Sequence, residues 1–262
     1  MKRYAVIGYP LKHTLSPLMH QANFQALHIE ATYEAKEVEH LAEAISMLKQ
    51  YDGFNVTLPH KQSIISYLDE IDELAKQIGA VNTIKRVGEK WVGYNTDADG
   101  FYQSFLEFNV PKQAKILIVG AGGAARAVFY ALQAHHYETI IVANRTLSRA
   151  STLTTRVLTL QEAGEQLENM DVVINTTSVG LAKDECPLDV TTLSAHTIVM
   201  DLIYKPTETR LLQEARQRGC PVKNGLEMLL FQGAIAFEYW FSKTADKLEM
   251  KRILEEELDV KW

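Results

Sequence analysis

A glycine-rich turn lies near the middle of the chain, between an apolar run and a helical pattern. Residues 116–119 read Ile-Leu-Ile-Val, and Gly120-Ala121-Gly122-Gly123-Ala124-Ala125 follows them and opens a helix-forming stretch. This order matches the G-x-G-x-x-A pattern, in which the first glycine allows a tight turn and the second lets the backbone approach a pyrophosphate. A small third residue, here Ala125, lets the helix pack on the strand. The turn predicts a dinucleotide-binding Rossmann unit with phosphates at a helix N-terminus, and a tight turn without a ligand is the alternative.

Short β-branched runs alternate with helical patterns along most of the chain. This order is typical of βαβ units and a parallel sheet, so the predicted fold class is α/β. Several runs are apolar on successive residues, which indicates strands that helices cover on both faces. The expected strands are residues 4–7, 53–58, 115–119, 139–143, 171–175 and 197–202.

The end of the first domain is expected near residues 101–113, where periodicity is lost and Pro111 precedes a predicted strand. Further on, apolar residues recur at helical spacing from 226 to 240, and residues 244–258 form a second helical pattern with a polar face. The ordinary interpretation of both stripes is core packing.

The composition excludes several classes of protein. The 262 residues are 47% hydrophobic and 23% charged, as in folded globular chains. A net charge of −6 without a basic block argues against nucleic acid as a partner. Cys186 and Cys220 lack the spacing of a disulfide framework or a zinc site, and the 8 histidines are scattered, so we expect no metal. Neither a membrane span nor a signal pattern is found, so we expect a cytoplasmic protein without a membrane partner.

The segment after the strand at 139–143 bears on which dinucleotide binds. About 20 residues past the glycines, NAD sites usually carry a carboxylate for the ribose 2′-hydroxyl. This chain has Asn144, Arg145, Thr146 and Arg149 there instead. Guanidinium groups match phosphate geometry, so the segment favours the 2′-phosphate of NADP. The alternative is that both arginines are solvated surface charges.

Polar side chains also gather in four segments of the first hundred residues, at 13–20, 55–61, 79–83 and 93–100. Each has an ordinary interpretation: Ser16 as an N-cap before Pro17, Lys61 as a surface lysine, and Asp97 and Asp99 as turn or cap residues. Together, a lysine, carboxylates, hydroxyls and amides at strand ends suit the binding and protonation of an oxygen-rich small molecule.

The order of these segments along the chain carries a resemblance. The motifs are His13-x-x-Ser16-Pro17-x-x-His20, Asn55-Val56-Thr57-x-Pro59-x-Lys61, Gly79-Ala80-Val81-Asn82-Thr83, Gly93-x-Asn95-Thr96-Asp97-x-x-Gly100, Gly120-x-Gly122-Gly123-Ala124, Asn144-Arg145-Thr146, Asn175-Thr176-Thr177-Ser178-x-Gly180, Asp201-x-x-Tyr204-x-Pro206, Asn224-Gly225 and Phe231-Gln232-Gly233-Ala234. With this ordered set, the sequence resembles the shikimate dehydrogenases from Gly8 to Gln232.

The resemblance implies an NADP-dependent reduction of 3-dehydroshikimate to shikimate, on the route to aromatic amino acids. It also implies two α/β domains: a substrate domain, residues 1–101 plus 236–262, and an inserted NADP-binding Rossmann domain, residues 102–235. We expect a monomer or a homodimer with a small-molecule substrate.

The resemblance also assigns roles to residues by their position in the motifs. Lys61 and Asp97 are the expected catalytic pair, with Lys61 as the proton donor; which of the two is the formal acid stays open because coupled groups titrate jointly. The expected substrate-binding residues are Thr14, Ser16, Thr57, Asn82, Asp97, Tyr204 and Gln232. The expected cofactor-binding residues are Gly120, Ala121, Gly122, Gly123, Ala124, Asn144, Arg145, Thr146, Arg149, Leu202 and Gly225, with Glu73 as a weaker candidate near the nicotinamide.

One position departs from the family pattern. The family usually carries serine where this chain has Thr14, and that hydroxyl is expected to reach the substrate carboxylate. Threonine keeps the hydroxyl but adds a methyl group, which stiffens the side chain and narrows the pocket. We expect shikimate still to bind, and the acceptance of the more substituted quinate stays open.

Three alternatives to this function remain. One is a quinate/shikimate dehydrogenase that uses NAD. Another is a tetrahydrofolate dehydrogenase of similar architecture, against which Ser16-Pro17 and Asn95-Thr96-Asp97 argue. The third, from a different class, is a non-catalytic regulator that senses NADP.

Overall fold

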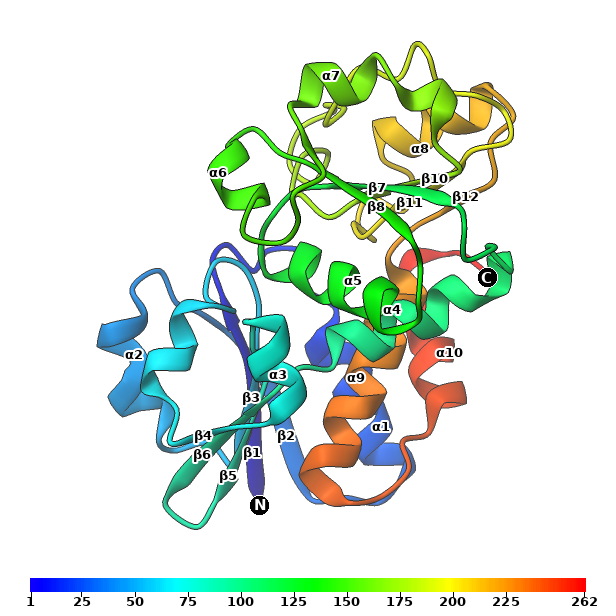
Figure 1. Ribbon diagram of the computed structural model, residues 1–262. Helices are drawn as coiled ribbons and strands as arrows, with labels where there is room; N and C mark the ends of the chain where they lie inside the picture. Colours follow the sequence, from blue (N-terminus) through cyan, green and yellow to red (C-terminus); the bar gives the residue numbers. More distant parts are fainter. The chain divides into compact units, whose positions relative to one another are not determined.

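The computed structural model describes residues 1–262 and divides the chain into two compact units (Figure 1). Unit 1 comprises Met1–Gly100 and Leu229–Trp262, and unit 2 comprises Phe101–Met228. The sequence led us to expect the divisions after residues 101 and 235. The observed divisions, after Gly100 and Met228, both fall inside helices: the first in α4 (Asp97–Phe105) and the second in α9 (Leu226–Phe241).

The sheet of unit 1 is mixed, with strand order β2-β1-β3-β5-β6-β4. β1 lies between β2 and β3 and is parallel to both, whereas β5 is antiparallel to β3 and β6. The short β4 pairs in parallel with β6. The strands are β1 (Lys2–Gly8), β2 (Ala31–Glu37), β3 (Gly53–Val56), β4 (Glu70–Ile71), β5 (Thr83–Val87) and β6 (Lys90–Tyr94).

Successive residues of a strand point to opposite sides of a sheet, and in this sheet the residues on both sides are buried. On one face, Ile7 and Phe54 pack in a cluster with Leu48 of α2. On the other face, Tyr4 lies 4.7 Å from the ring of Trp240 in α9 and 5.8 Å from that of Phe24 in α1. The helices of unit 1 are α1 (Ser16–Ala26), α2 (Leu41–Leu48), α3 (Glu73–Ile78) and α10 (Lys247–Leu258), with the 3₁₀ turn η1 (Ser63–Tyr67).

Helix α1 begins one residue earlier than its sequence suggests. Leu15 occupies the N-cap position, Ser16 is the first helical residue, and no side chain caps the helix. The interpretation of Ser16 as the N-cap is therefore wrong. Pro17 still lies in the first turn, where its missing N–H costs no hydrogen bond.

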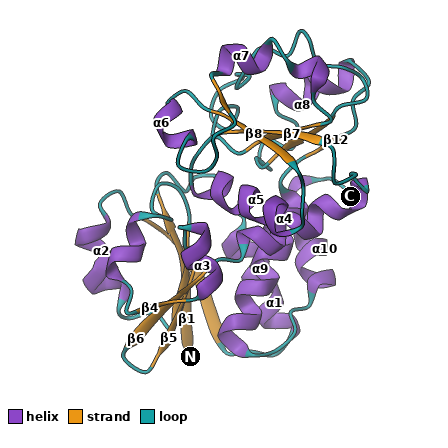
Figure 2. Cartoon of the chain, viewed as in Figure 1, coloured by secondary structure: helices purple, strands orange, loops and turns teal.

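Figure 2 shows the strands of unit 2 in orange among purple helices. The sheet is fully parallel, with strand order β12-β11-β10-β7-β8-β9. Numbered from its first strand, this is the 3-2-1-4-5-6 order of a Rossmann fold, in which the order reverses between β7 and β10. The strands are β7 (Lys115–Val119), β8 (Thr139–Ala143), β9 (Val157–Leu158), β10 (Val172–Asn175), β11 (Ile198–Asp201) and β12 (Val222–Lys223). The predicted α/β class is confirmed, and the predicted parallel sheet is found in unit 2, whereas the sheet of unit 1 is mixed.

Helices and short turns connect these strands. They are α5 (Gly123–Ala134), α6 (Leu147–Ala150), α7 (Leu160–Gly164), α8 (Arg210–Gln217) and the 3₁₀ turns η2 (Leu106–Phe108) and η3 (Leu167–Asn169). A buried cluster that includes Leu117, Val173 and Val199 joins the sheet to Leu211 of α8. None of the helices in either unit is long and apolar enough to cross a membrane.

Candidate active site

Several loops leave the sheet of unit 1 at the same edge. The parallel strands β1 and β3 end there, at Gly8 and Val56. Because β5 runs in the opposite direction, its first residue, Thr83, pairs with Asn55 near the end of β3 and with Tyr94 at the end of β6. Residues 57–61, 79–82 and 95–97 follow or precede these ends. The carboxyl edge of an α/β sheet is where ligands usually bind.

Lys61 and Asp97 form an ion pair at this edge. The Lys61 Nζ donates to Asp97 Oδ2 over 2.6 Å, and the two side chains are only 16% and 5% exposed. The interpretation of Lys61 as a surface lysine is therefore wrong. A short, charge-assisted hydrogen bond of this kind is strong and holds both groups in a defined position.

Asp97 is the first residue of α4, yet its carboxylate does not cap the helix. The Asn95 Oδ1 atom accepts from the backbone N–H groups of Asp97 and Ala98, over 3.0 and 3.2 Å. The interpretation of Asp97 as a cap residue is therefore wrong, since Asn95 caps the helix instead. The Asp97 carboxylate stays available for Lys61, and the first turn of the helix favours its negative charge.

Asn82 forms a hydrogen bond to the other oxygen of the Asp97 carboxylate. Its Nδ2 donates to Asp97 Oδ1 and to Thr96 Oγ1, each over 2.9 Å. Its Oδ1 accepts from the Thr96 backbone N–H over 2.8 Å, and the residue is only 2% exposed. Asn82, Asp97 and Lys61 thus form one connected group, which we call the catalytic cluster.

The loop that carries Lys61 is anchored at two points. The Lys61 carbonyl oxygen accepts from the Val81 N–H over 2.8 Å. The neighbouring His60 is buried, and its Nε2 lies 2.6 Å from the Val38 carbonyl oxygen. Because a carbonyl only accepts, the imidazole carries its proton on Nε2. These contacts tie the loop to the ends of β2 and β5.

Gln232, in α9 of the C-terminal part of the chain, also lies beside the catalytic cluster. Its Oε1 lies 3.5 Å from Asn82 Nδ2, and its Nε2 donates to the Leu229 carbonyl over 2.8 Å. Helix α4 approaches α9 closely here: a Cβ added to Gly100 would lie 2.7 Å from the Gln232 nitrogen. Gly100 therefore permits the spacing that places Gln232 beside Asn82.

Thr14, Ser16 and Thr57 of unit 1 form no hydrogen bond to the cluster. Thr14 Oγ1 accepts from the Ser16 N–H over 3.4 Å, in the segment that follows β1. Thr57 follows β3, and its N–H donates to the Ile7 carbonyl on the adjacent strand over 2.8 Å. Tyr204 is half-buried and belongs to unit 2, where it follows β11.

Glu73, the weaker cofactor candidate, lies at the surface of unit 1. Its side chain is 73% exposed and forms a 3.5 Å ion pair with Lys76, one turn further along α3. The described contacts of Glu73 are all local to this helix, so they add nothing to its candidacy.

The glycine turn of unit 2 has the geometry that its sequence predicts. Gly120 has φ +114°, and an added Cβ would lie 2.5 Å from Thr176 Oγ1. Gly122 is the N-cap of α5, has no atoms within 4 Å of an added Cβ, and no side chain caps the helix. Ala125 is fully buried against the sheet. The uncapped helix start with open space before it suits an anion such as a pyrophosphate.

The segment after β8 presents two unpaired cations. Arg145 and Arg149 are exposed, and neither guanidinium group forms an ion pair or a side-chain hydrogen bond in the structure. Asn144 Nδ2 donates to the Thr146 carbonyl over 2.9 Å, which shapes the turn between them. No carboxylate competes for these guanidinium groups, so both are available to a phosphate.

A buried carboxylate joins the loops that follow β10 and β11. Asp201 accepts from Asn175 Nδ2 and the Ile203 N–H over 3.0 Å, and from Thr209 Oγ1 over 2.7 Å. Burial raises the pKa of this carboxyl group to about 6, although these hydrogen bonds oppose the rise. The network fixes the start of the loop that contains Leu202.

Leu202 and Gly225, two expected cofactor residues, lie in contact. An added Cβ at Gly225 would lie 2.1 Å from the Leu202 carbonyl oxygen, so only glycine fits. The Gly225 N–H donates to the Ile203 carbonyl over 3.0 Å. The structure therefore brings these two expected residues together at the end of β11.

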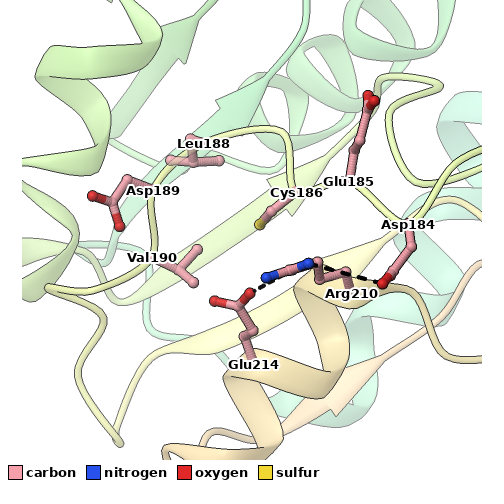
Figure 3. A pocket seen from close by; sticks show the side chains of 8 residues that line it. All are labelled: Asp184, Glu185, Cys186, Leu188, Asp189, Val190, Arg210 and Glu214. Carbon is pink, nitrogen blue, oxygen red and sulfur yellow. Dashed lines mark hydrogen bonds and ion pairs between the residues drawn. The ribbon is translucent and has the colours of Figure 1, made fainter.

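A separate surface pocket of about 420 Å³ opens on unit 2, and none of the expected site residues lines it. Figure 3 shows Arg210 between Glu214 and Asp184, with which it pairs over 2.8 Å and 3.8 Å. Four of its charged side chains are acidic and one, Arg210, is basic, so the lining is acidic overall. The lining residues are Asp184, Glu185, Cys186, Leu188, Asp189, Val190, Arg210 and Glu214.

Sequence reasoning gave no individual role to several residues that hold the catalytic cluster. Thr96, Thr83 and Asn55 appear only inside the quoted motifs, and Tyr33 appears in none. Their signal is weak because each is a common residue on or beside a strand. Only the strand pairing, which the sequence leaves open, brings them to Asn82.

Unit 2 has a Rossmann-type sheet, and unit 1 is an α/β unit that holds a nearly buried lysine–aspartate pair. Together the two units define a class, the two-domain dinucleotide-dependent dehydrogenases. Three family models match the chain: "Shikimate dehydrogenase substrate binding domain" over residues 6–84, "Shikimate / quinate 5-dehydrogenase" over 105–182, and "Shikimate 5'-dehydrogenase C-terminal domain" over 225–255. The chain belongs to the shikimate dehydrogenase family, which confirms the resemblance carried by its motifs.

Individual relatives agree with the family over nearly the full length. The chain is 45% identical to the shikimate dehydrogenase (NADP(+)) of Bacillus cereus strain AH187, with 96% of each chain covered. It is 36% identical, with a TM-score of 0.88 and coverage of 98% and 99%, to the shikimate 5-dehydrogenase of Thermus thermophilus, solved with NADP(H) and shikimate. It is 29% identical, with a TM-score of 0.86 and coverage of 97% and 99%, to a quinate dehydrogenase from Corynebacterium glutamicum, solved with NAD.

Proposed function

We propose that this chain is an NADP-dependent oxidoreductase that interconverts 3-dehydroshikimate and shikimate in the biosynthesis of aromatic amino acids. The observation that carries the proposal is the Lys61–Asp97 pair, 2.6 Å apart and nearly buried at the ligand-binding edge of unit 1. Membership of the family and the names of the relatives support the substrate and the cofactor.

Lys61 and Asp97 carry the proton chemistry in this proposal. The Lys61 ammonium donates a proton to the oxygen that becomes the hydroxyl, and its charge stabilises the negative charge that develops there. Asp97 holds the ammonium in position through Oδ2, while Asn82 Nδ2 donates to the other carboxylate oxygen. When the reaction runs in the oxidative direction, the same pair accepts the proton.

The substrate's hydroxyl and carboxylate groups are assigned to residues that the family resemblance implies. In addition to Asn82 and Asp97, these are Thr14, Ser16, Thr57, Tyr204 and Gln232. The position of Gln232 Oε1, 3.5 Å from Asn82 Nδ2, supports its place in the set. Thr57 has an unengaged hydroxyl at the end of β3, which supports a role in accepting or donating a hydrogen bond to substrate.

The residues of unit 2 fit NADP, whose reduced form would supply the hydride and whose oxidised form would accept it in the reverse direction. The uncapped start of α5 and the open space at Gly122 suit the pyrophosphate. Arg145 and Arg149 suit the 2′-phosphate, because both are exposed and unpaired. The full proposed set is Gly120, Ala121, Gly122, Gly123, Ala124, Asn144, Arg145, Thr146, Arg149, Leu202 and Gly225.

We place this activity in the cytoplasm, in a monomer or a homodimer. Light scattering behind size-exclusion chromatography distinguishes the two from each other and from larger assemblies. A mass of 29.6 kDa identifies the monomer.

The substrate and cofactor are tested together by initial rates of reduced-nicotinamide formation. The purified chain is assayed with shikimate or quinate, each with NADP+ or NAD+. We expect the highest kcat/KM for shikimate with NADP+. A chain that binds NADP+ but turns over neither acid is a regulator rather than a dehydrogenase.

Quinate with NAD+ is the second candidate function, since the chain shares its fold over nearly its whole length with a quinate dehydrogenase solved with NAD. Thr14 and the two arginines argue against it, because the extra methyl group narrows the carboxylate site and no acidic residue stands ready for the ribose 2′-hydroxyl. A kcat/KM for quinate with NAD+ above that for shikimate with NADP+ establishes the second function.

A further inference from the structure

A buried polar chain leads away from the catalytic cluster into the aromatic core of unit 1. Asn55, on β3, is 6% exposed. Its Nδ2 donates to the Asn82 carbonyl over 3.1 Å and to Thr83 Oγ1 over 2.9 Å. Its Oδ1 accepts from the Tyr33 hydroxyl, on β2, over 2.7 Å. Asn55 thus connects Tyr33, on the edge strand β2, to Asn82 and Thr83 at the start of β5.

Only one orientation of the Asn55 amide fits these partners. The Asn82 carbonyl oxygen accepts and cannot donate, so it must face Nδ2 and not Oδ1. Oδ1 then faces Tyr33, and the tyrosine must donate its proton. A reversed amide would place two oxygen atoms against each other inside the protein, which is costly where water is excluded.

The direction of these bonds passes on to Asn82 through Thr83. Thr83 Oγ1 accepts from Asn55, and its own proton points to the nearer of two acceptors, Asn82 Oδ1 at 3.1 Å rather than Thr96 Oγ1 at 3.4 Å. Asn82 Oδ1 also accepts from the Thr96 N–H over 2.8 Å. With its oxygen so occupied, Asn82 must present Nδ2 to Asp97 Oδ1. The other carboxylate oxygen is left to Lys61.

The ring of Tyr33 is held in place at the far end of the chain. It is 6% exposed and stacks on His20 of α1, with ring centroids 4.4 Å apart and planes 13° from parallel. The ring of Trp240 lies 6.1 Å away. The hydroxyl of Tyr33 therefore has little freedom to leave Asn55.

We propose that Tyr33, Asn55 and Thr83 are positioning residues for the proton-transferring pair. By fixing the orientation of the Asn82 amide, they make Asp97 meet a donor rather than an oxygen atom, and so keep its second oxygen on Lys61. This inference rests on the proposed function of Lys61 and Asp97. None of the three residues is assigned a contact with substrate or cofactor.

Two hydroxyl deletions test the chain without changing the size of a side chain greatly. Tyr33→Phe removes the donor to Asn55, and Thr83→Val removes the link to Asn82 Oδ1. We expect each to lower kcat by about 3- to 30-fold with KM for shikimate within about twofold, because a misplaced pair transfers the proton poorly although the substrate still binds. Thr83→Ser keeps the hydroxyl and should restore most of the kcat.

The matched control is Tyr51→Phe. Tyr51 is fully buried and its hydroxyl donates to Glu34 over 2.5 Å, so this variant also loses a tyrosine hydrogen bond, but one that leads away from the cluster. We expect its kcat to stay within about twofold of the wild type. An equal loss in Tyr51→Phe and Tyr33→Phe would indicate general destabilisation and overturn the proposal.

The decisive comparison adds Tyr33→Phe to Asp97→Asn. The Asp97→Asn variant has no carboxylate to which the Asn82 amide must donate. We therefore expect Tyr33→Phe to lower the kcat of this variant by less than about twofold. A Tyr33→Phe effect that is the same with and without the carboxylate, or a kcat within twofold of wild type in the single variant, overturns the proposal. An inactive wild-type chain would instead contradict the proposed function.

Discussion

At the scale of single residues, charge and burial distinguish the side chains to which we assign a function from ordinary ones. Lys61 and Asp97 are nearly buried together, whereas Arg145 and Arg149 are exposed and unpaired. The sequence predicts all four as candidates, but the burial of the first pair depends on loops that meet only in the folded sheet. Residue types therefore define the candidates, and their surroundings decide between the functional and the ordinary interpretation.

The two unpaired arginines predict a specific kinetic change. Replacing both Arg145 and Arg149 by alanine should raise KM for NADP+ by about tenfold or more, because a lost charged hydrogen bond costs about 1.5–3 kcal/mol. KM for NAD+, which lacks the 2′-phosphate, should change less than about twofold. Arg216→Ala removes an exposed arginine that pairs with Glu208 on unit 2, and serves as the control. Equal losses for both cofactors would refute the 2′-phosphate assignment.

His20 predicts a pH-dependent change in stability. Its imidazole is fully buried, neither ring nitrogen has a hydrogen-bond partner in the protein, and burial lowers its pKa to about 3. The unfolded chain, with an ordinary pKa near 6.5, takes up a proton that the folded chain refuses. Folding therefore loses stability as the pH falls below about 6.5.

The substitution His20→Phe should remove this loss and keep the stack on Tyr33. Measured by urea unfolding, the free energy of unfolding of the variant should rise relative to wild type by about 2 kcal/mol between pH 7 and pH 5. Phe24→Leu, in the same aromatic cluster but without a titrating group, should show no such trend. A pH-independent difference for His20→Phe would mean that the imidazole is charged or paired in the fold.

At the scale of elements, the predictable strands are those that lie inside a sheet. All six expected strands are present, with ends that differ by one or two residues, because buried strands are continuously apolar. The unexpected strands are of three kinds. β2 lies at an edge and alternates buried and partly exposed residues, and β4, β9 and β12 have two residues each. β5 and β6 form an antiparallel pair whose outer residues are exposed. The two C-terminal helices were also predictable from their apolar spacing, at Leu226–Phe241 and Lys247–Leu258.

The glycine turn shows how one element combines a structural and a functional glycine. Gly120→Ala should lower the free energy of unfolding by about 1–3 kcal/mol, since φ +114° and the nearby Thr176 both oppose a side chain. Gly122→Ala should leave it within about 1 kcal/mol, because φ is −87° and the space is open, yet should raise KM for NADP+ by about tenfold.

Thermal unfolding and cofactor titration of the two variants separate these effects. The assignment of the turn to the pyrophosphate would be lost if Gly122→Ala bound NADP+ as tightly as wild type. A Gly120→Ala variant of normal stability would show that the turn can relax.

At the scale of the whole molecule, the chain assigns different tasks to different units. Unit 1 holds the catalytic cluster, and unit 2 holds the glycine turn, the two arginines and the Asp201 network. The sequence predicts both kinds of unit, since each carries its own motifs. It does not predict the mixed strand order of unit 1, because the antiparallel pairing of β5 depends on long-range contacts that no local pattern encodes.

The central claim is that Lys61 in unit 1 transfers the proton while NADP binds at unit 2, and steady-state kinetics of Lys61→Met with shikimate and NADP+ test it most directly. Lys76→Met, at an exposed lysine of α3, is the control, and calorimetry gives the Kd for NADP+. We predict a kcat about 10²- to 10⁴-fold below wild type with an unchanged Kd and a normal control. A Lys61→Met variant that folds and keeps a near-normal kcat would contradict the account.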